Sequence, residues 1–163
     1  MTTSAASADT LTEKDNPTAP PSRSPRGSTR SKARKRALDI LFEAELRGAD
    51  PLETLNARAA AADPPVRDYT SQLVHGVIAR QPEIDSRLSA CISAGWTLER
   101  MPRVDRAVAR IAVFEIDHLG LADAIAISEA VALVADLSTD DSPGYLSGLL
   151  GAIAGSKSGA ASA

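Results

Sequence analysis

The chain has 163 residues, of which 44% are hydrophobic, 24% charged and 3% aromatic, and its formal net charge is −3. This length allows one domain with a buried core, and the shortage of aromatic residues favours packed helices built on Leu, Ile, Val and Ala. A single cysteine, Cys91, excludes a disulfide framework and a cysteine-based zinc cluster. No apolar run reaches the roughly 18 residues that span a membrane, and residues 1–20 lack the apolar stretch of a secretory signal, so we expect a cytoplasmic protein.

The charge is unevenly distributed along the chain. Residues 1–36 contain eight basic and three acidic residues, whereas the remainder contains ten basic and 18 acidic residues. A basic arm on an acidic body is typical of a protein that binds an anionic partner on one side and can bind a cationic partner on the other.

Taken in chain order, the sequence predicts a tail, a helical domain and a second tail. Residues 1–29 are rich in Ser, Thr, Pro and Ala, so we expect a disordered N-terminal tail, and 155–163 read as a disordered C-terminal tail. Between them, apolar residues at helical spacing predict one all-helical domain over residues 30–154, and no alternating pattern predicts a strand. The expected helices cover about 31–47, 51–63, 66–80, 82–95, 102–120, 123–137 and 142–154.

Start and stop signals support this division. Gly48 is a natural end for the first helix, and Asp50 followed by Pro51 is typical of a helix N-terminus. The helix over 102–120 is apolar around most of its circumference, which places it at the centre of the fold. Short connections imply antiparallel neighbours in a bundle. The glycines of "PGYLSGLLGAIAG" follow a helical pattern and indicate close packing of helices.

A search for catalytic chemistry finds little. His75 and Cys91 lie among apolar residues, which favours packing roles. Glu115 and His118 have Glu-x-x-His spacing, but a di-iron bundle needs a second pair, which is absent. No phosphate-binding loop or cofactor fingerprint occurs, so we expect no catalytic residues, no metal and no cofactor.

The basic cluster at the start of the first helix remains to be explained. Cations are unfavourable there because a helix N-terminus carries partial positive charge. An anionic strand across this end would remove both that penalty and the repulsion among the cations. This argument favours nucleic-acid binding over a solvated face or a generic polyanion patch. We therefore expect alanine replacements to weaken nucleic-acid binding and to leave thermal stability unchanged or improved. The replaced residues would be Lys32, Arg34, Lys35 and Arg36.

Three segments resemble the signature blocks of the NusB family of bacterial transcription antitermination factors. They are "ARKRALDILFEAE", "GWTLERMPRVDRAVARIAVFEI" and "AIAISEAVALVADLSTDDSPGYLSGLLGAI", and the similarity is collinear over residues 31–154. The resemblance implies an all-α fold of seven helices in two small antiparallel bundles. It also implies binding without catalysis, to boxA of nascent ribosomal RNA together with the small-subunit ribosomal protein NusE, in company with RNA polymerase and other Nus factors.

The resemblance also implies site residues. The basic motif corresponds to Arg30, Lys32, Arg34, Lys35 and Arg36 as RNA contacts. Further expected RNA contacts are Arg103, Arg106, Asp141 and Tyr145, where the tyrosine would stack on an unpaired base or pack in the core. Expected contacts to the ribosomal partner are Glu99, Asp105 and Asp117, although solvated helix faces explain Glu99 and Asp117 equally well.

Two other functions stay open at this level. Related helical domains are fused to RNA methyltransferases, so the chain could be an accessory RNA-binding domain of such a system. A structural homodimer with a nonspecific polyanion-binding arm is the other alternative. The sequence does not decide between a monomer and a homodimer.

Overall fold

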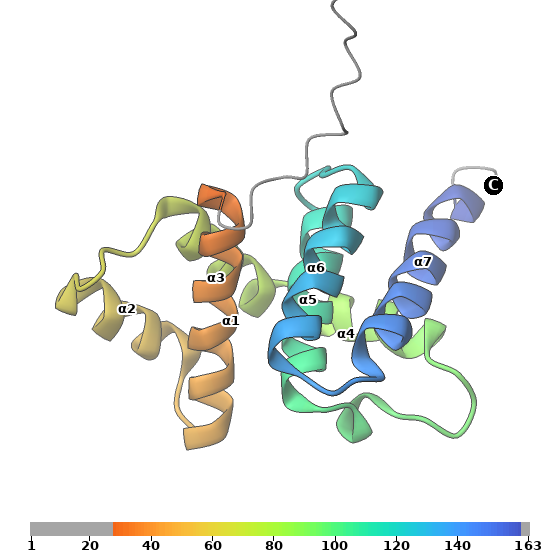
Figure 1. Cartoon of the computed structure of the whole chain (residues 1–163), viewed down its shortest axis with the longest axis horizontal. Helices are drawn as coiled ribbons and strands as arrows, with labels where there is room; N and C mark the ends of the chain where they lie inside the picture. The colour runs from red at the N-terminus through yellow and green to blue at the C-terminus, as the bar shows by residue number, and fades with distance from the viewer. Residues whose placement is uncertain (1–27, 161–163) are drawn as a thin grey trace, which may run out of the picture.

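The computed structural model describes residues 28–160, with side chains up to Lys157. This part of the chain contains seven α-helices and one short 3₁₀ turn and has no strand, which confirms the predicted all-α class (Figure 1). In chain order the elements are α1 (Thr29–Arg47), α2 (Pro51–Ala61), α3 (Asp68–Ala79), α4 (Gln81–Cys91), η1 (Leu98–Arg100), α5 (Arg103–Asp117), α6 (Asp123–Leu137) and α7 (Ser142–Ala160).

The helix ends follow the expected capping chemistry. Asp50 accepts a hydrogen bond from the Leu52 amide at 2.8 Å, and Pro51 is the first residue of α2. Gly48 ends α1 in the left-handed conformation, with φ of 63°. Both predicted helix ends are confirmed, because capping depends on residues that are neighbours along the chain.

The helical domain extends further at both ends than predicted. Most of the two predicted tails lies outside the described residues, but the Ser28 side chain caps α1, and α7 continues past residue 154 to Ala160. Lys157 Nζ lies 3.3 Å from Asp123 Oδ1, and Arg87 donates to the Ile153 carbonyl at 3.0 Å. These contacts tie the last turns of α7 to α4 and α6, which explains why they stay helical.

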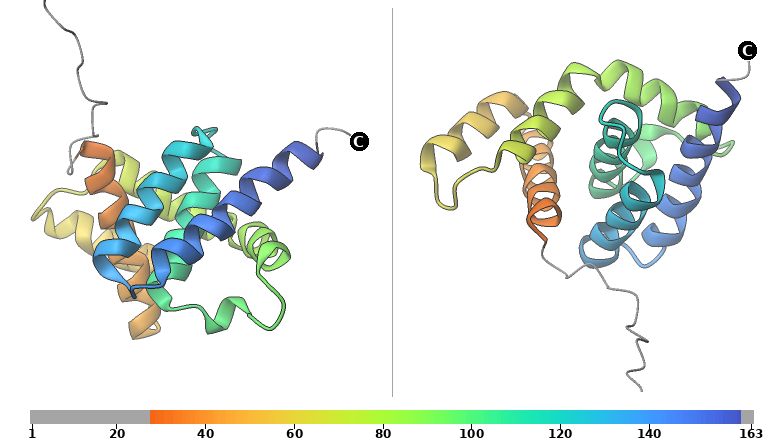
Figure 2. Two further views of the ribbon diagram at one scale, coloured as in Figure 1. Left: turned by 45° about the vertical axis from the view of Figure 1, so that its right-hand side comes forward. Right: turned by 90° about the horizontal axis from the view of Figure 1, so that it is seen from above.

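The helices form two groups around α5. Figure 1 shows α1, α2 and α3 on one side and α4, α6 and α7 on the other, and Figure 2 shows α5 between them. α5 packs against α1, α3, α4, α6 and α7, and every residue from Ile111 to Ile116 is buried. The predicted central helix is thereby confirmed, and α5 is the element that joins the two bundles.

α3 and α5 pack tightly against each other at Gly76. A Cβ atom placed on Gly76 would lie 1.9 Å from Cζ of Phe114, far inside van der Waals contact. Gly76 is therefore required because the Phe114 ring lies directly on the α3 backbone.

The glycines of α7 differ from expectation. A Cβ on Gly144, Gly148, Gly151 or Gly155 would meet nothing within 4 Å, so these glycines do not mediate close packing of helices among the residues that the structure describes. The side chains that hold α7 in the core lie on its other face, at Leu146, Leu150 and Ile153. The helical spacing was read correctly, but spacing alone does not indicate which face is covered.

We expect Gly76→Ala to destabilise the fold by about 1–3 kcal/mol, because the added methyl group must displace the Phe114 ring. Gly148→Ala is the matched control, since the same change in an open helical position should stabilise the protein by up to about 1 kcal/mol. Chemical denaturation of both variants measures the difference. Equal stability of the two variants would contradict the close contact at Gly76.

Candidate nucleic-acid interface

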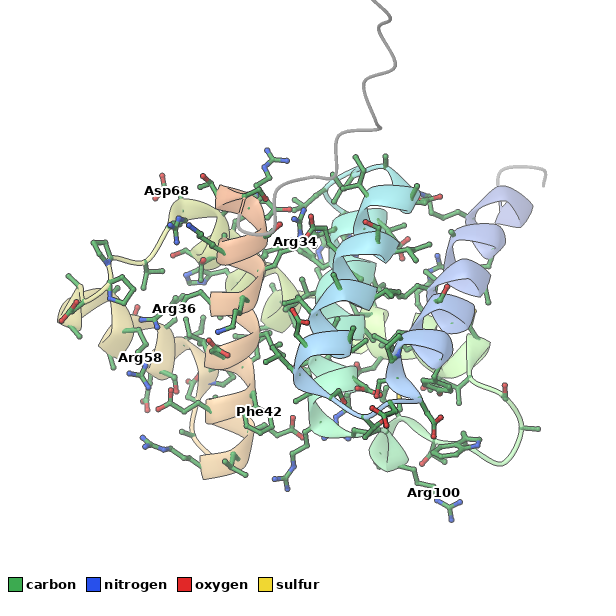
Figure 3. The ribbon with its side chains drawn as sticks, viewed as in Figure 1. Arg34, Arg36, Phe42, Arg58, Asp68 and Arg100 are labelled. Atoms are coloured by element: carbon green, nitrogen blue, oxygen red, sulfur yellow. The ribbon has the colours of Figure 1, made fainter. Side chains whose placement is uncertain are left out.

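The basic residues at the start of α1 point in different directions around the helix, as their consecutive positions predict. Arg30, Lys32 and Lys35 are exposed, Arg36 is half-buried, and Arg34 is buried with only 3% of its surface exposed. Figure 3 shows Arg34 on the side of α1 that faces α5 and α6, and Arg36 on the opposite side. The cluster is thus divided between a surface and the interior.

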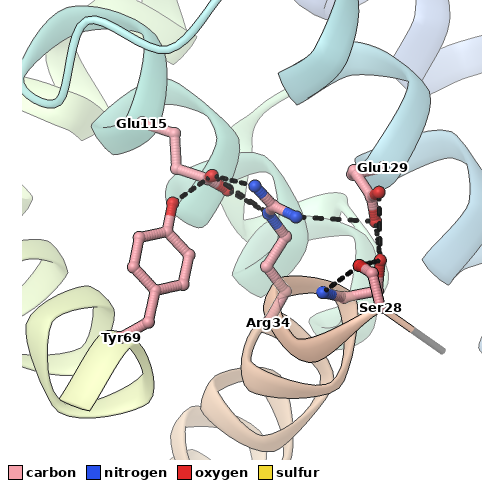
Figure 4. Close-up of polar contacts among 6 residues, drawn as sticks. Ser28, Arg34, Tyr69, Glu115 and Glu129 are labelled. Carbon is pink, nitrogen blue, oxygen red and sulfur yellow. Dashed lines mark hydrogen bonds and ion pairs between the residues drawn. The ribbon is translucent and has the colours of Figure 1, made fainter. Parts of the chain in front are cut away.

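Arg34 forms a buried ion pair that crosses between the two bundles (Figure 4). Its Nε donates to Glu115 Oε1 at 2.9 Å and its Nη2 to Glu115 Oε2 at 2.8 Å. The Tyr69 hydroxyl donates to the same Glu115 oxygen at 2.6 Å, and Arg34 Nη1 lies 3.6 Å from Glu129 Oε2. The expectation that Arg34 contacts RNA is therefore corrected, because its guanidinium is enclosed by residues of α3, α5 and α6.

The environment keeps Arg34 charged and Tyr69 neutral. Burial alone would lower the pKa of Arg34, but the hydrogen bonds and negative charge of Glu115 outweigh burial and raise it. Burial and then the hydrogen bond to Glu115 raise the pKa of Tyr69 to about 12. The Tyr69 hydroxyl therefore remains a hydrogen-bond donor throughout the neutral pH range.

Glu129 of α6 provides negative charge at the start of α1. The Ser31 hydroxyl donates to both Glu129 carboxylate oxygens, at 2.9 and 3.0 Å, and the Ser31 amide donates to Ser28 Oγ at 3.1 Å. A carboxylate near a helix N-terminus interacts favourably with the helix dipole. The unfavourable placement of cations at the positive end of the helix is thus compensated within the chain, by Glu115 and Glu129, without an external anion.

The remaining cations at this end have few partners in the described part of the chain. Lys35 Nζ lies 3.7 Å from Asp39, but both side chains are more than half exposed, so this pair contributes little. Lys32 forms no ion pair among residues 28–160, and the Arg30 guanidinium lies over the Tyr69 ring. Arg36 has a buried Nε without a hydrogen-bond partner in this region. The exposed cations at the start of α1 are therefore Arg30, Lys32 and Lys35, which surround this end of the helix and are together called the basic face.

Asp105 is buried instead of facing a partner. Its exposed fraction is 2%, and it accepts hydrogen bonds from Ser138 at 2.5 Å and Ser142 at 2.8 Å. These bonds tie the first turn of α5 to the connection between α6 and α7. The expectation that Asp105 contacts the ribosomal partner is corrected for this reason.

Tyr145 lies beside an exposed tryptophan. The centres of the Tyr145 and Trp96 rings are 6.1 Å apart at an angle of 42°, and Trp96 is 55% exposed. Tyr145 is half-buried, and burial followed by the charge of Asp105 raises its pKa. Asp141 is exposed nearby at the start of α7. Trp96 is not among the RNA-binding residues predicted from sequence. It is the single tryptophan of an aromatic-poor chain, and this is a signal by which it could have been identified.

Arg103 and Arg106 differ in exposure. Arg106 forms an ion pair with Glu45 and donates to the Leu98 carbonyl at 3.1 Å, so its side chain fixes η1 against α5. Arg103 is exposed and lies 3.9 Å from the same glutamate. Both line a groove of about 750 Å³ between α1, η1 and α5, where Glu45 and Glu99 interleave with the arginines. This alternation of charge does not make a cradle for an anion.

Asp117 and Glu99, two residues expected to contact the ribosomal partner, lie in different surroundings. Asp117 accepts two hydrogen bonds from Arg87, at 2.8 and 3.1 Å, which assigns it to the contact between α4 and α5. Glu99 is exposed at the rim of the groove. Hydrogen bonds from its own backbone and from Thr97 lower the pKa of Glu99, so it stays ionised. Glu99 is the one of the three expected partner residues with a free surface.

The predicted RNA residues therefore form two separate groups. Arg34 and Glu45 lie eleven positions apart on α1, which corresponds to about 16 Å at the rise of an α-helix. The basic face lies at the start of α1, whereas Arg103, Asp141 and Tyr145 lie toward the other end, near the start of α5. No group of His, Cys, Asp or Glu in the described region could hold a metal ion, and none of its helices is long and apolar enough to cross a membrane.

Comparisons with known proteins agree on one family. The model of the NusB family matches residues 31–155. The transcription antitermination protein NusB of Cutibacterium acnes is 57% identical over 126 residues, covering 77% of this chain and 48% of that protein. The NusB protein of a Nocardioides species is 50% identical over 131 residues, covering 80% of this chain and 96% of that protein.

Solved structures show the same fold. NusB of T. maritima matches with a TM-score of 0.70 at 23% identity, covering 78% of this chain and 91% of that chain. A crystal structure of the antitermination factors NusB and NusE in complex with dsRNA matches with a TM-score of 0.69 at 24% identity, covering 78% and 96%.

We expect Arg34→Ala to destabilise the protein by about 3–5 kcal/mol, because Glu115 would be left buried without its counter-charge. This outcome replaces the unchanged stability expected for the whole basic cluster from sequence. Lys35→Ala is the control and should change stability by less than about 0.5 kcal/mol. Urea denaturation measures both values, and a similar small effect for Arg34→Ala would refute the structural assignment.

Proposed function

The chain belongs to the NusB family, and we propose that it is a transcription antitermination factor that binds RNA and catalyses no reaction. The family match and the similarity to proteins named as antitermination factors support this proposal. Such a factor acts on nascent transcripts, so we place it in the cytoplasm with RNA polymerase and other Nus factors.

The single observation that carries RNA binding is the exposed basic face of Arg30, Lys32 and Lys35. These cations project from one end of α1, while the nearby carboxylates of Glu115 and Glu129 are engaged by Arg34 and Ser31. Neutralising phosphates and releasing their counterions favours binding of a polyanion to such a surface. The proposed ligand is a single-stranded boxA sequence of ribosomal RNA transcripts.

Bases would be recognised away from this basic face. Tyr145 and the exposed Trp96 provide flat surfaces on which unpaired bases can stack, and Asp141 and Arg103 lie toward the same end of the fold. Phosphate contacts position an RNA, whereas contacts to base edges and faces specify its sequence. An RNA strand that uses both groups would cross the fold from the start of α1 to the start of α7 (Figure 1).

We propose that the protein partner is the ribosomal protein NusE, and that Glu99 contributes to the contact. The named complex of NusB and NusE with dsRNA supports such an assembly. The net negative charge of the chain outside its first 36 residues is complementary to a basic protein. Glu99 is exposed and its lowered pKa keeps it charged.

The RNA proposal is tested by the double variant Lys32→Ala, Lys35→Ala. For single strands each lost phosphate contact should reduce the salt slope by about 0.7, so we expect weaker binding to a boxA RNA and a slope lowered by about 1.4. Arg47→Ala, Arg80→Ala removes the same charge from other exposed positions and is the control. Electrophoretic mobility shifts over a salt series measure both variants, and identical slopes would refute the basic face.

The partner contact is tested by Glu99→Lys. Charge reversal should weaken association with NusE several-fold, with the largest effect at low salt, because rim charges act through long-range attraction. Glu53→Lys, at an exposed position of α2, is the matched control. Titration calorimetry with purified NusE distinguishes the two, and equal affinity would exclude Glu99 from the interface.

A further inference from the structure

Arg30 differs from the other exposed cations because an aromatic ring lies beneath it. The guanidinium carbon of Arg30 is 5.0 Å from the centre of the Tyr69 ring, and that of Arg34 is 5.6 Å from the same centre. The negative face of an aromatic ring attracts a cation at these distances. Two arginines one helical turn apart on α1 are thus attracted to one tyrosine of α3.

The Tyr69 ring is itself held firmly. Its backbone belongs to α3, and its hydroxyl donates to Glu115 of α5 at 2.6 Å, beside the buried guanidinium of Arg34 (Figure 4). A ring fixed at both ends is a rigid support. Arg30, in contrast, is exposed and has no carboxylate partner among the described residues.

A held arginine is suited to binding phosphate. The guanidinium is planar, so it can lie on a ring with one face and still donate hydrogen bonds from its edge. A long, mobile side chain loses rotamer freedom when it binds a ligand, and a side chain already in position loses less. Lys32 and Lys35 are exposed without such a support, so Arg30 is the pre-positioned cation of the basic face.

We propose that Tyr69 is a positioning residue for RNA binding, which holds the Arg30 guanidinium in place for an RNA phosphate. This inference rests on the proposed RNA-binding function and adds a residue of α3 that itself makes no contact with RNA.

A double-mutant cycle tests the proposal. Dissociation constants for a single-stranded boxA RNA are measured for Arg30→Ala, Tyr69→Leu and the double variant. We expect about tenfold weaker binding for Arg30→Ala, about threefold for Tyr69→Leu, and no further loss in the double variant, because Tyr69 acts only through Arg30. Tyr69→Phe keeps the ring and should bind RNA nearly as the wild type does, while losing stability with its bond to Glu115.

The outcomes separate the inference from the proposed function. If the fold-losses in RNA affinity of Arg30→Ala and Tyr69→Leu multiply in the double variant, the positioning role of Tyr69 is overturned, and the proposed binding of RNA by the basic face is unaffected. Wild-type affinity of Arg30→Ala, with an unchanged salt slope, overturns Arg30 as an RNA contact and the role of Tyr69 with it.

A second variant keeps the proposal testable if Tyr69→Leu does not fold. Arg30→Lys retains the charge but loses the planar face, so we expect an unchanged salt slope and about threefold weaker binding. Binding of Arg30→Lys with wild-type affinity would overturn the positioning role.

Discussion

The buried pair of Arg34 and Glu115 is the interaction on which the arrangement of the two bundles depends. Arg34 comes from α1 and Glu115 from α5, and both side chains are almost fully enclosed. Taking two charges out of water is costly unless their geometry is good and their remaining hydrogen-bonding groups are satisfied. The two-point contact, the Tyr69 hydroxyl and the nearby Glu129 meet these conditions, and they fix how α1 lies against α5 and α6.

This pair also determines which cations are available to a ligand. Because Arg34 is ion-paired in the interior, the exposed cations at the start of α1 are Arg30, Lys32 and Lys35. The same acidic residues compensate the charge that the cluster places at the helix N-terminus. The interior and the surface of this region are therefore parts of one electrostatic arrangement, in which Tyr69 contacts both an inner and an outer arginine.

The sequence predicted the helices better than the site. Helix ends such as Gly48 and Asp50, and the central position of α5, depend on local chemistry and on the apolar pattern, and both were readable. Arg34 could not be distinguished from its exposed neighbours, because its partner Glu115 lies 81 positions away along the chain. The spacing of Glu115 and His118 within one helix likewise gives no sign that Glu115 pairs with an arginine of α1. The burial of Asp105 was not predictable from sequence for a similar reason, because its partners Ser138 and Ser142 lie 33 and 37 positions away along the chain. The contacts of Trp96 with Tyr145 and of Tyr69 with Arg30 likewise depend on tertiary packing.

The open glycine face of α7 has a consequence for how this part of the molecule assembles. Each glycine disfavours a helix by about 1 kcal/mol relative to alanine, and α7 has four of them on a side that nothing covers in the described chain. The isolated segment has too little intrinsic preference to be helical in water. Its coil-to-helix transition must therefore coincide with insertion of Leu146, Leu150 and Ile153 into the core, so secondary and tertiary structure form together in the C-terminal bundle.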